Sequence, residues 1–285
     1  MLIASQSNEG ARVPWAHLRI PPFPLIAIRV LQLTNQEDAP MRRLSDLISS
    51  DPAFSSEILT IANSALYASR VPIRSVLQAI AMLGTNSIQG LSLTVGVRAY
   101  MGKALHHDSL RAIWRHSLAC ALIANQLAAA GTTDKDSAYT AGILHDIGRL
   151  ALAVISPREY ATLLETHSGS PASVLEAERG LFGFDHCEAG RRLIADWKMP
   201  PYLSEVVADH HSPRVHHDNW LMPDLIHVSC RMADTIGFAV FQGCDLTPYA
   251  DLLAALPDRE RRSFCPDGEV LAFDVSSKIN AVEFS

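Results

Sequence analysis

Apolar residues recur at three- and four-residue steps along most of the chain, with polar residues between them. This spacing places the apolar side chains on one face of an α-helix. Alternating apolar and polar runs, which are typical of β-strands, and Asn-Gly hairpin turns are almost absent. The pattern therefore predicts an all-α protein of amphipathic helices that bury their apolar faces against one another. The expected helices cover 25–33, 41–49, 52–64, 76–83, 87–100, 109–130, 158–167, 172–180, 201–211 and 221–241, with further helices that carry His145 and His186.

Several of these helices have recognisable beginnings. Asp51 precedes Pro52, and proline at the first helical position has the φ angle that a helix needs. Ser75 and Asp185 are expected to cap the helices that follow them, because their side chains accept hydrogen bonds from free backbone N–H groups. Start signals of this kind predict the residue at which each of these helices begins.

A histidine and an aspartate, His145 and Asp146, lie next to each other inside the apolar run 141–150. In a continuous helix His145 shares the inward stripe of its apolar neighbours. Burying both groups is costly unless something pairs them. A divalent cation would pair them, since imidazole and carboxylate both bind first-row metals. The alternative is a hydrogen-bonded pair within a core helix.

Further histidines and a second aspartate also lie on apolar faces, and helical proteins place metal sites where such residues converge. His210 and His211 follow each other, and neighbours on a helix point about 100° apart. One of the two is therefore expected to be a ligand and the other a lid or an outer group. Glu176 and Glu178 are expected on a solvated face, with a role as outer partners of a metal as the alternative. The inward polar residues are His116, His145, Asp146, His186, His210, His211 and Asp234.

This order of residues resembles the ligand order of the HD superfamily of metal-dependent phosphohydrolases, and the surrounding sequence resembles its HDOD branch, the HD-related output domain of bacterial signalling proteins. The resemblance extends from about residue 20 to residue 213. Its motifs are Ile20-Pro-Pro-Phe-Pro24, Asp51-Pro-Ala53, Ile61-Ala-Asn-Ser-Ala-Leu-Tyr67, Trp114-Arg-His-Ser117, Ala141-Gly-Ile-Leu-His-Asp-Ile-Gly148, Trp197-Lys-Met-Pro200 and His210-His-Ser-Pro213.

The resemblance implies a multi-helical HD-like bundle with an N-terminal helical lobe. We expect a disordered tail at 1–14, an HDOD domain at 15–214 and a C-terminal helical extension at 215–285 that packs on the HD-like lobe. The domain itself would divide into an N-terminal lobe, 15–105, and an HD-like lobe, 106–214. The implied metal is Fe, Mn, Zn or Mg, as one or two ions, held by the inward residues listed above. Asp146 would bridge two ions and is the candidate catalytic residue.

The family resemblance implies a regulatory module of signal transduction that acts through contacts with signalling proteins. The alternative is a metal-dependent phosphohydrolase that acts on a nucleotide or another phosphoester. A third reading is a nucleotide-binding module that uses the metal as an anchor. Against cyclic di-GMP hydrolysis, Ser212-Pro-Arg-Val-His-His217 replaces the Gly-Tyr-Pro segment of that enzyme branch, and Arg149 replaces its lysine.

The amino-acid composition argues against some classes of binding partner. The 285 residues are 48% hydrophobic and 19% charged, with a net charge of -6, which argues against a general nucleic-acid binder. The five cysteines are scattered without a Cys-x-x-Cys pair, so we expect most of them to be reduced, buried thiols. Cys187 is expected to stay outside any metal site, with a contact to such a site through its neighbour His186 as the alternative. No signal peptide and no membrane-spanning run is evident. The sequence thus predicts a cytoplasmic protein.

Overall fold

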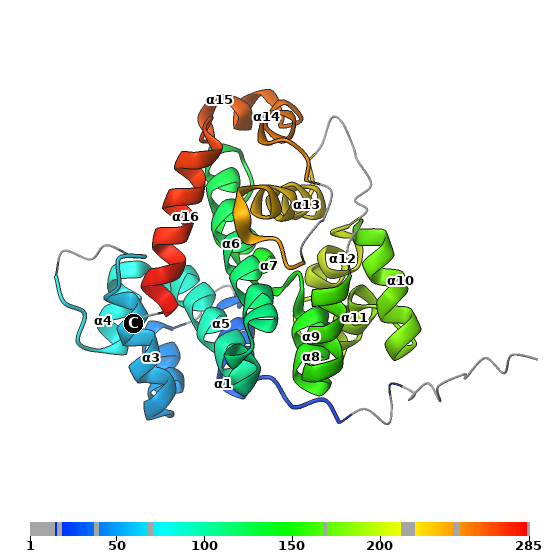
Figure 1. The fold of residues 1–285 in the computed structure, drawn as a ribbon. Helices are drawn as coiled ribbons and strands as arrows, with labels where there is room; N and C mark the ends of the chain where they lie inside the picture. Colours follow the sequence, from blue (N-terminus) through cyan, green and yellow to red (C-terminus); the bar gives the residue numbers. More distant parts are fainter. Residues whose placement is uncertain are drawn as a thin grey trace, which may run out of the picture.

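The computed structural model describes residues 15, 19–36, 40–67, 71–167, 170–211, 220–241 and 246–283. Within these ranges every regular element is helical and there is no β-strand, which confirms the all-α prediction. The expected tail, the pair His216-His217 and Cys244 lie outside the described residues. Figure 1 shows the helices arranged around the long helix α6.

The N-terminal helices form the first group. They are α1 (Leu25–Thr34), α2 (Met41–Ser49), α3 (Pro52–Ala62), α4 (Val76–Leu83) and α5 (Thr85–Met101), followed by a short 3-10 helix, η2 (Gly102–His106). Asp51 accepts a hydrogen bond from Phe54 N and Ser75 accepts one from Gln78 N, as their positions before helices predict. Helix α5 is the centre of the group, because α1, α3 and α4 all pack against it.

The second group surrounds α6 (Asp108–Ala130). It continues with α7 (Lys135–Leu144), α8 (Ile147–Ile155), α9 (Pro157–Thr166), α10 (Pro171–Phe182), α11 (His186–Asp196) and α12 (Tyr202–Asp209). Helix α6 packs against α7, α8 and α9, and α11 packs against α8 and α12. The apolar window in 135–155 has a mean hydropathy of 1.2, and 89% of it is buried inside the protein. The apolar side chains of this window therefore pack in the protein core.

The last helices cover the other side of α6. They are α13 (Met222–Ala233), a π-helical turn η3 (Asp234–Phe238), α14 (Tyr249–Ala254), α15 (Asp258–Ser263) and α16 (Gly268–Glu283). Helices α13, α15 and α16 all contact α6. Figure 1 shows α16 running along α6 towards the N-terminal helices. Within the C-terminal extension, α16 is a regular helix of 16 residues that buries Leu271, Val275, Ile279 and Val282.

Two expected helices are interrupted in the structure. The helix predicted to carry His145 and Asp146 ends at Leu144, and α8 begins at Ile147, so both residues lie in a tight turn. The predicted helix 221–241 changes to a π-helical turn at Asp234 that ends at Phe238 and contains Gly237, whose φ of 103° favours glycine. In both places the interruption occurs at candidate site residues, where departures from regular helix are frequent.

Candidate metal centre

The turn between α7 and α8 places a histidine and an aspartate in the middle of the protein. Asp146 has φ -100° and ψ 23°, outside regular helix, and is 1% exposed. His145 is fully buried. Glycines on either side allow this close packing: a Cβ at Gly142 would come within 2.6 Å of the Ala121 backbone of α6. The turn is therefore held against α6 at the level of His116.

Four buried histidines are oriented in the same way. Each has its Nδ1 beside an oxygen that can only accept a hydrogen bond, so the neutral ring carries its proton on Nδ1. In that tautomer Nε2 is the accepting nitrogen of each ring, which is how proteins orient metal-binding imidazoles. The Nδ1 contacts are His116 to Phe238 O (2.9 Å), His145 to Gly142 O (2.6 Å), His186 to Glu178 Oε2 (2.6 Å) and His210 to Val207 O (3.0 Å).

Three buried acceptor atoms converge at the turn between α7 and α8. His145 Nε2, Asp146 Oδ1 and His210 Nε2 are buried and have no hydrogen-bond partner. His145, Asp146 and His210 each offer a ligand atom, and these atoms all lie within 4.8 Å of one another. Three buried acceptors without a donor are costly to the protein. A divalent cation satisfies all three at once, so the residues present fit a metal ion.

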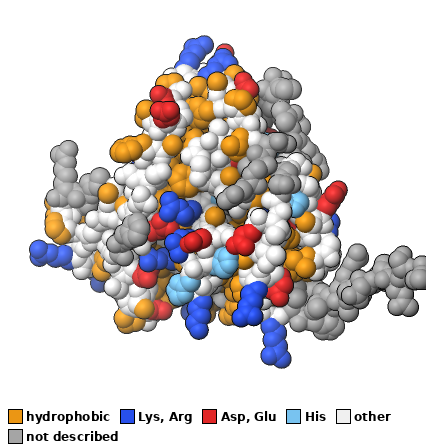
Figure 2. Space-filling view, in the orientation of Figure 1, with side chains coloured by type: hydrophobic (Ala, Val, Ile, Leu, Met, Phe, Trp, Pro, Cys, Tyr) orange, Lys and Arg blue, Asp and Glu red, His pale blue; other side chains and the backbone are white. Residues whose placement is uncertain are grey.

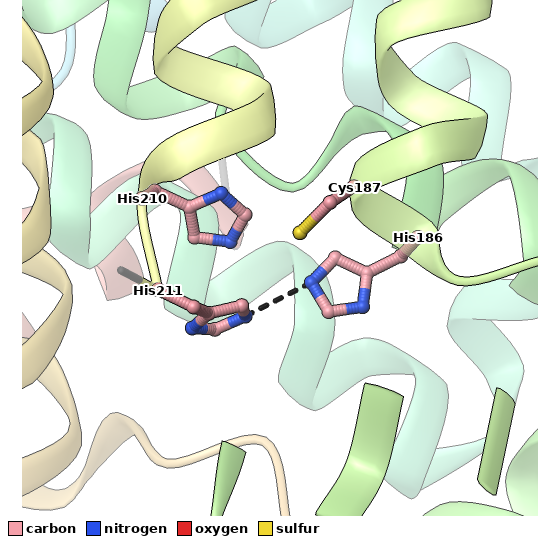
Figure 3. Close-up of side chains that lie close together, drawn as sticks. All are labelled: His186, Cys187, His210 and His211. Atoms are coloured by element: carbon pink, nitrogen blue, oxygen red, sulfur yellow. Dashed lines mark hydrogen bonds between the residues drawn. The ribbon is translucent and has the colours of Figure 1, made fainter. Parts of the chain in front are cut away.

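A second group of possible ligands flanks Asp146 on the side of α11 and α12. Figure 3 shows His186, Cys187, His210 and His211 facing one another, and their ligand atoms also lie within 4.8 Å. His186 Nε2 lies 2.9 Å from His211 Nε2. His210 and His211 follow the last residue of α12, and their ring centroids are 4.0 Å apart. The division of the pair into a ligand and an outer group stays a prediction: His210 Nε2 approaches Asp146 Oδ1, whereas His211 Nε2 lies against His186 Nε2.

A third group lies on the side of α6 and α13. Ligand atoms of His116, His145 and Cys230 lie within 4.8 Å of one another, and His116 Nε2 is 3.4 Å from Cys230 Sγ. Asp234 Oδ1 lies 3.4 Å from His116 Nδ1, on the opposite side of that ring from Nε2. Asp234 thus borders the cluster, while Nε2 of His116 lies beside Cys230 Sγ.

All seven candidate residues meet in one region. Ring centroids are 5.3 Å apart for His116 and His145, 5.0 Å for His145 and His210, and 5.5 Å for His186 and His210. His186 Nε2 and His210 Nε2 both approach Asp146 Oδ1, at 3.4 and 3.3 Å. Asp146 is therefore the centre of the cluster.

Arg149 and Glu178 complete the surroundings of Asp146. Arg149 Nε donates to Asp146 Oδ2 at 3.0 Å, and its NH2 lies 3.2 Å from His186 Nε2. Glu178 accepts from the His186 backbone N–H at 2.9 Å and from the Tyr160 hydroxyl at 2.7 Å. The expectation of a solvated Glu178 is wrong, because it is fully buried as an outer partner of His186. Its spacing eight residues before His186 gave no sequence signal, since the contact depends on how α10 turns into α11.

Burial and neighbouring charges shift the pKa values of residues in and beside the cluster. Burial lowers the pKa of His145 to about 3, which keeps that imidazole neutral. Burial alone would raise the pKa of Asp146, but Arg149 and the neighbouring histidines hold it well below its usual range. Burial likewise opposes ionisation of Glu178, yet His186 and Arg149 lower its pKa to about 2. At neutral pH His145 is thus neutral and Asp146 ionised, which are the forms that bind cations.

Replacing Tyr160 by phenylalanine should test the outer partner. The change removes the hydroxyl that donates to Glu178 Oε1 and leaves a buried carboxylate oxygen short of a donor. We expect a loss of about 1–3 kcal/mol in the free energy of unfolding, as for other buried unsatisfied groups. Urea titration of both proteins measures it. A change below about 0.5 kcal/mol, the usual range of surface substitutions, would show that Glu178 does not depend on this bond.

Comparison with known proteins supports the same fold. The HDOD domain model matches residues 20–213. Among solved structures, an HDOD domain protein of unknown function from Geobacter sulfurreducens has a TM-score of 0.67 at 23% identity, covering 93% of this chain and 91% of its own. A protein from Marinobacter aquaeolei VT8, proposed to act in signal transduction, has a TM-score of 0.71 at 21% identity, covering 93% and 59%. At such identities the likeness shows the fold.

Two further proteins are similar to the chain. A protein from Shewanella amazonensis SB2B, proposed to be a metal-dependent phosphohydrolase, has a TM-score of 0.65 at 20% identity and covers 93% of each chain. An uncharacterized protein of Treponema pallidum (strain Nichols) is 26% identical over 204 residues, which are 68% of this chain. The chain spans 38% of the length of that relative.

Proposed function

Because the chain belongs to the HDOD family, we propose that it is a bacterial signal-transduction module that acts through protein contacts in the cytoplasm and holds a divalent cation in its histidine cluster. The likeness to the Marinobacter aquaeolei signal-transduction protein supports the regulatory part. The observation that carries the metal is the set of three converging buried atoms without partners, on His145, Asp146 and His210. The bound ion would supply a fixed positive charge that joins α7, α11 and α12.

The charges of the cluster favour one ion. Three carboxylates and two guanidinium groups lie in or beside it, so one negative charge remains when the histidines are neutral. One divalent cation leaves a single positive charge, while two would leave three among mostly buried side chains, at high cost. The charged residues counted are Asp146, Glu178, Asp234, Arg149 and Arg231.

The burial of the candidate metal ligands favours a regulatory role over phosphoester hydrolysis. A hydrolytic metal keeps an open position for water and substrate. Here His145, Asp146 and His210 are at most 1% exposed, and Arg149 already uses the second oxygen of Asp146. Such an ion would order the fold around it, as metals do when they bind only the folded state.

Phosphoester hydrolysis is the second candidate, and one observation favours it. Asp234 lies beside His116 and also lines an open cleft of about 760 Å³ that reaches Thr235, Gly237 and Phe241. A substrate in this cleft would approach the cluster from the side of η3. The proposed activity of the similar Shewanella amazonensis protein agrees with this candidate.

Removal of the metal should lower the stability of the protein. We expect the melting temperature to fall after treatment with a chelator and to recover when Zn²⁺, Mn²⁺, Fe²⁺ or Mg²⁺ is added back. At a free concentration of about 100 Kd, a ligand of the folded state contributes roughly 2.7 kcal/mol. His210→Gln should abolish the response. The control His107→Gln, at a half-exposed histidine outside the cluster, should keep it.

A hydrolysis assay separates the two candidates. The metal-loaded protein is incubated with bis(p-nitrophenyl) phosphate, cyclic di-GMP and nucleoside triphosphates, and the products are separated by chromatography. We expect no turnover above that of the buffer. Turnover that His210→Gln abolishes and His107→Gln retains would establish the second candidate instead.

A further inference from the structure

A second polar site lies outside the histidine cluster, in a cleft of about 370 Å³ between η2, α6 and α16. Three arginines line it, although the chain as a whole has a net charge of -6. Figure 2 shows basic, acidic and histidine side chains together near the middle of this face of the molecule. The lining residues are Arg98, Gly102, Leu105, His106, Arg111, Trp114, Arg115 and Glu283.

The arginines are only partly neutralised. Glu283 is the single acidic residue of the lining, and its Oε2 lies 2.5 Å from Arg115 NH1. Arg98 Nη1 donates to the Val282 carbonyl at 3.2 Å and lies 3.7 Å from Glu57, whose side chain is 46% exposed. Arg111 Nη2 lies 3.4 Å from Asp108, whose side chain is 95% exposed. Exposed ion pairs of this kind contribute little. The cleft therefore keeps a positive potential that attracts anions.

Trp114 adds a donor that the protein leaves unused. The residue is 2% exposed and lines the cleft, and its indole Nε1 has no hydrogen-bond partner. A buried N–H without an acceptor destabilises the folded protein. The indole N–H can only donate, as can the unsatisfied Nη1 of Arg149, so only an acceptor can satisfy it.

We propose that this cleft binds a small phosphorylated ligand of nucleotide size, and that Glu283 is the internal anion which the ligand displaces. Guanidinium groups match phosphate oxygens as two-pronged donors, and several of them around one cleft favour phosphate over a single carboxylate. A volume of about 370 Å³ lies within the usual range for small-ligand sites. Leu105 and Trp114 offer an apolar wall to the uncharged part of the ligand.

The cleft is a separate site that adjoins the histidine cluster. Arg115 and His116 are neighbours on α6, and the Arg115 guanidinium lies 5.8 Å from the centre of the Phe238 ring. The Phe238 carbonyl is the group that orients His116. The ligand site nevertheless uses no atom of the cluster, so the proposal does not depend on a bound metal.

Titration calorimetry of the full chain with pyrophosphate and with ADP tests the proposal. We expect saturable binding of both, tighter for ADP if the apolar wall contributes. Arg115→Gln and Arg98→Gln should each weaken binding roughly tenfold, the effect of losing one charge-assisted hydrogen bond. Glu283→Gln should instead tighten binding several-fold, because it removes the competing carboxylate. The exposed Arg158→Gln is the matched control and should leave binding unchanged.

Opposite effects of the two substitutions at one ion pair are hard to obtain by misfolding, and melting curves of all variants check the fold. Binding that Arg115→Gln leaves intact would overturn the proposal, as would the absence of saturable binding. Loss of binding in His210→Gln together with retention in Arg115→Gln would place the ligand at the histidine cluster and would also overturn it. Weaker binding in Glu283→Gln would contradict the displacement.

Discussion

Replacing Asp146 by alanine is expected to lower the free energy of unfolding by about 3–5 kcal/mol, even in protein stripped of metal. Asp146 is buried and pairs with Arg149, which is 2% exposed. Removing one partner of a buried pair leaves the other charge without compensation, and this is among the most damaging single changes. Denaturant titration in the presence of a chelator measures the loss.

Two further variants test the cause of this loss. Asp196→Ala removes an exposed carboxylate from α11 and should change stability by less than about 0.5 kcal/mol. Arg149→Met in the Asp146→Ala background should recover part of the loss, because it removes the unpaired guanidinium. A stability of Asp146→Ala close to that of the unaltered protein would mean that Arg149 finds its charge balance elsewhere.

Replacing Gly148 by alanine should separate α8 from α11 and lower the free energy of unfolding by roughly 3 kcal/mol or more. A Cβ at Gly148 would lie 1.9 Å from the His186 carbonyl oxygen and 2.6 Å from Gly190 N. Both are backbone atoms, so no side-chain rotation relieves the clash. Because His186 is on the displaced segment, the variant should also bind metal more weakly.

The matched control is Gly180→Ala on α10, where an added Cβ meets nothing within 4 Å. Alanine is a better helix former than glycine, so this variant should be neutral or more stable by up to about 1 kcal/mol. Equal effects of the two substitutions would show that the contact of α8 with α11 is looser than the structure has it.

The sequence predicted the helices well because their signals are local. Asp51, Ser75 and Asp185 each accept the capping hydrogen bond expected from their position. The two interrupted helices were not predictable from periodicity, since the apolar stripe continues through His145 and through Asp234. The turn at His145 depends on contacts of Gly142 with α6 and of Gly148 with α11, which are remote along the chain.

The candidate site was predicted in part. Histidines on apolar faces of separate helices indicated convergence, and the structure brings them together. The surroundings of Asp146 could not be predicted in the same way: Glu178 and Tyr160 contact the cluster through tertiary packing of α9 and α10. Cys187 and Cys230 also offer sulfur atoms within 4.8 Å of the histidine ligand atoms. The position of Cys187 next to His186 left such a contact open as the alternative.

The most direct test of the metal centre is elemental analysis of protein purified without chelators, by inductively coupled plasma mass spectrometry. Unaltered protein is compared with Asp146→Ala and with His107→Gln. We expect about one divalent ion for each chain in the unaltered protein and in His107→Gln, and a large loss in Asp146→Ala. Metal-free protein that also takes up no Zn²⁺, Mn²⁺, Fe²⁺ or Mg²⁺ on dialysis would contradict the account and leave the cluster as a hydrogen-bonded core.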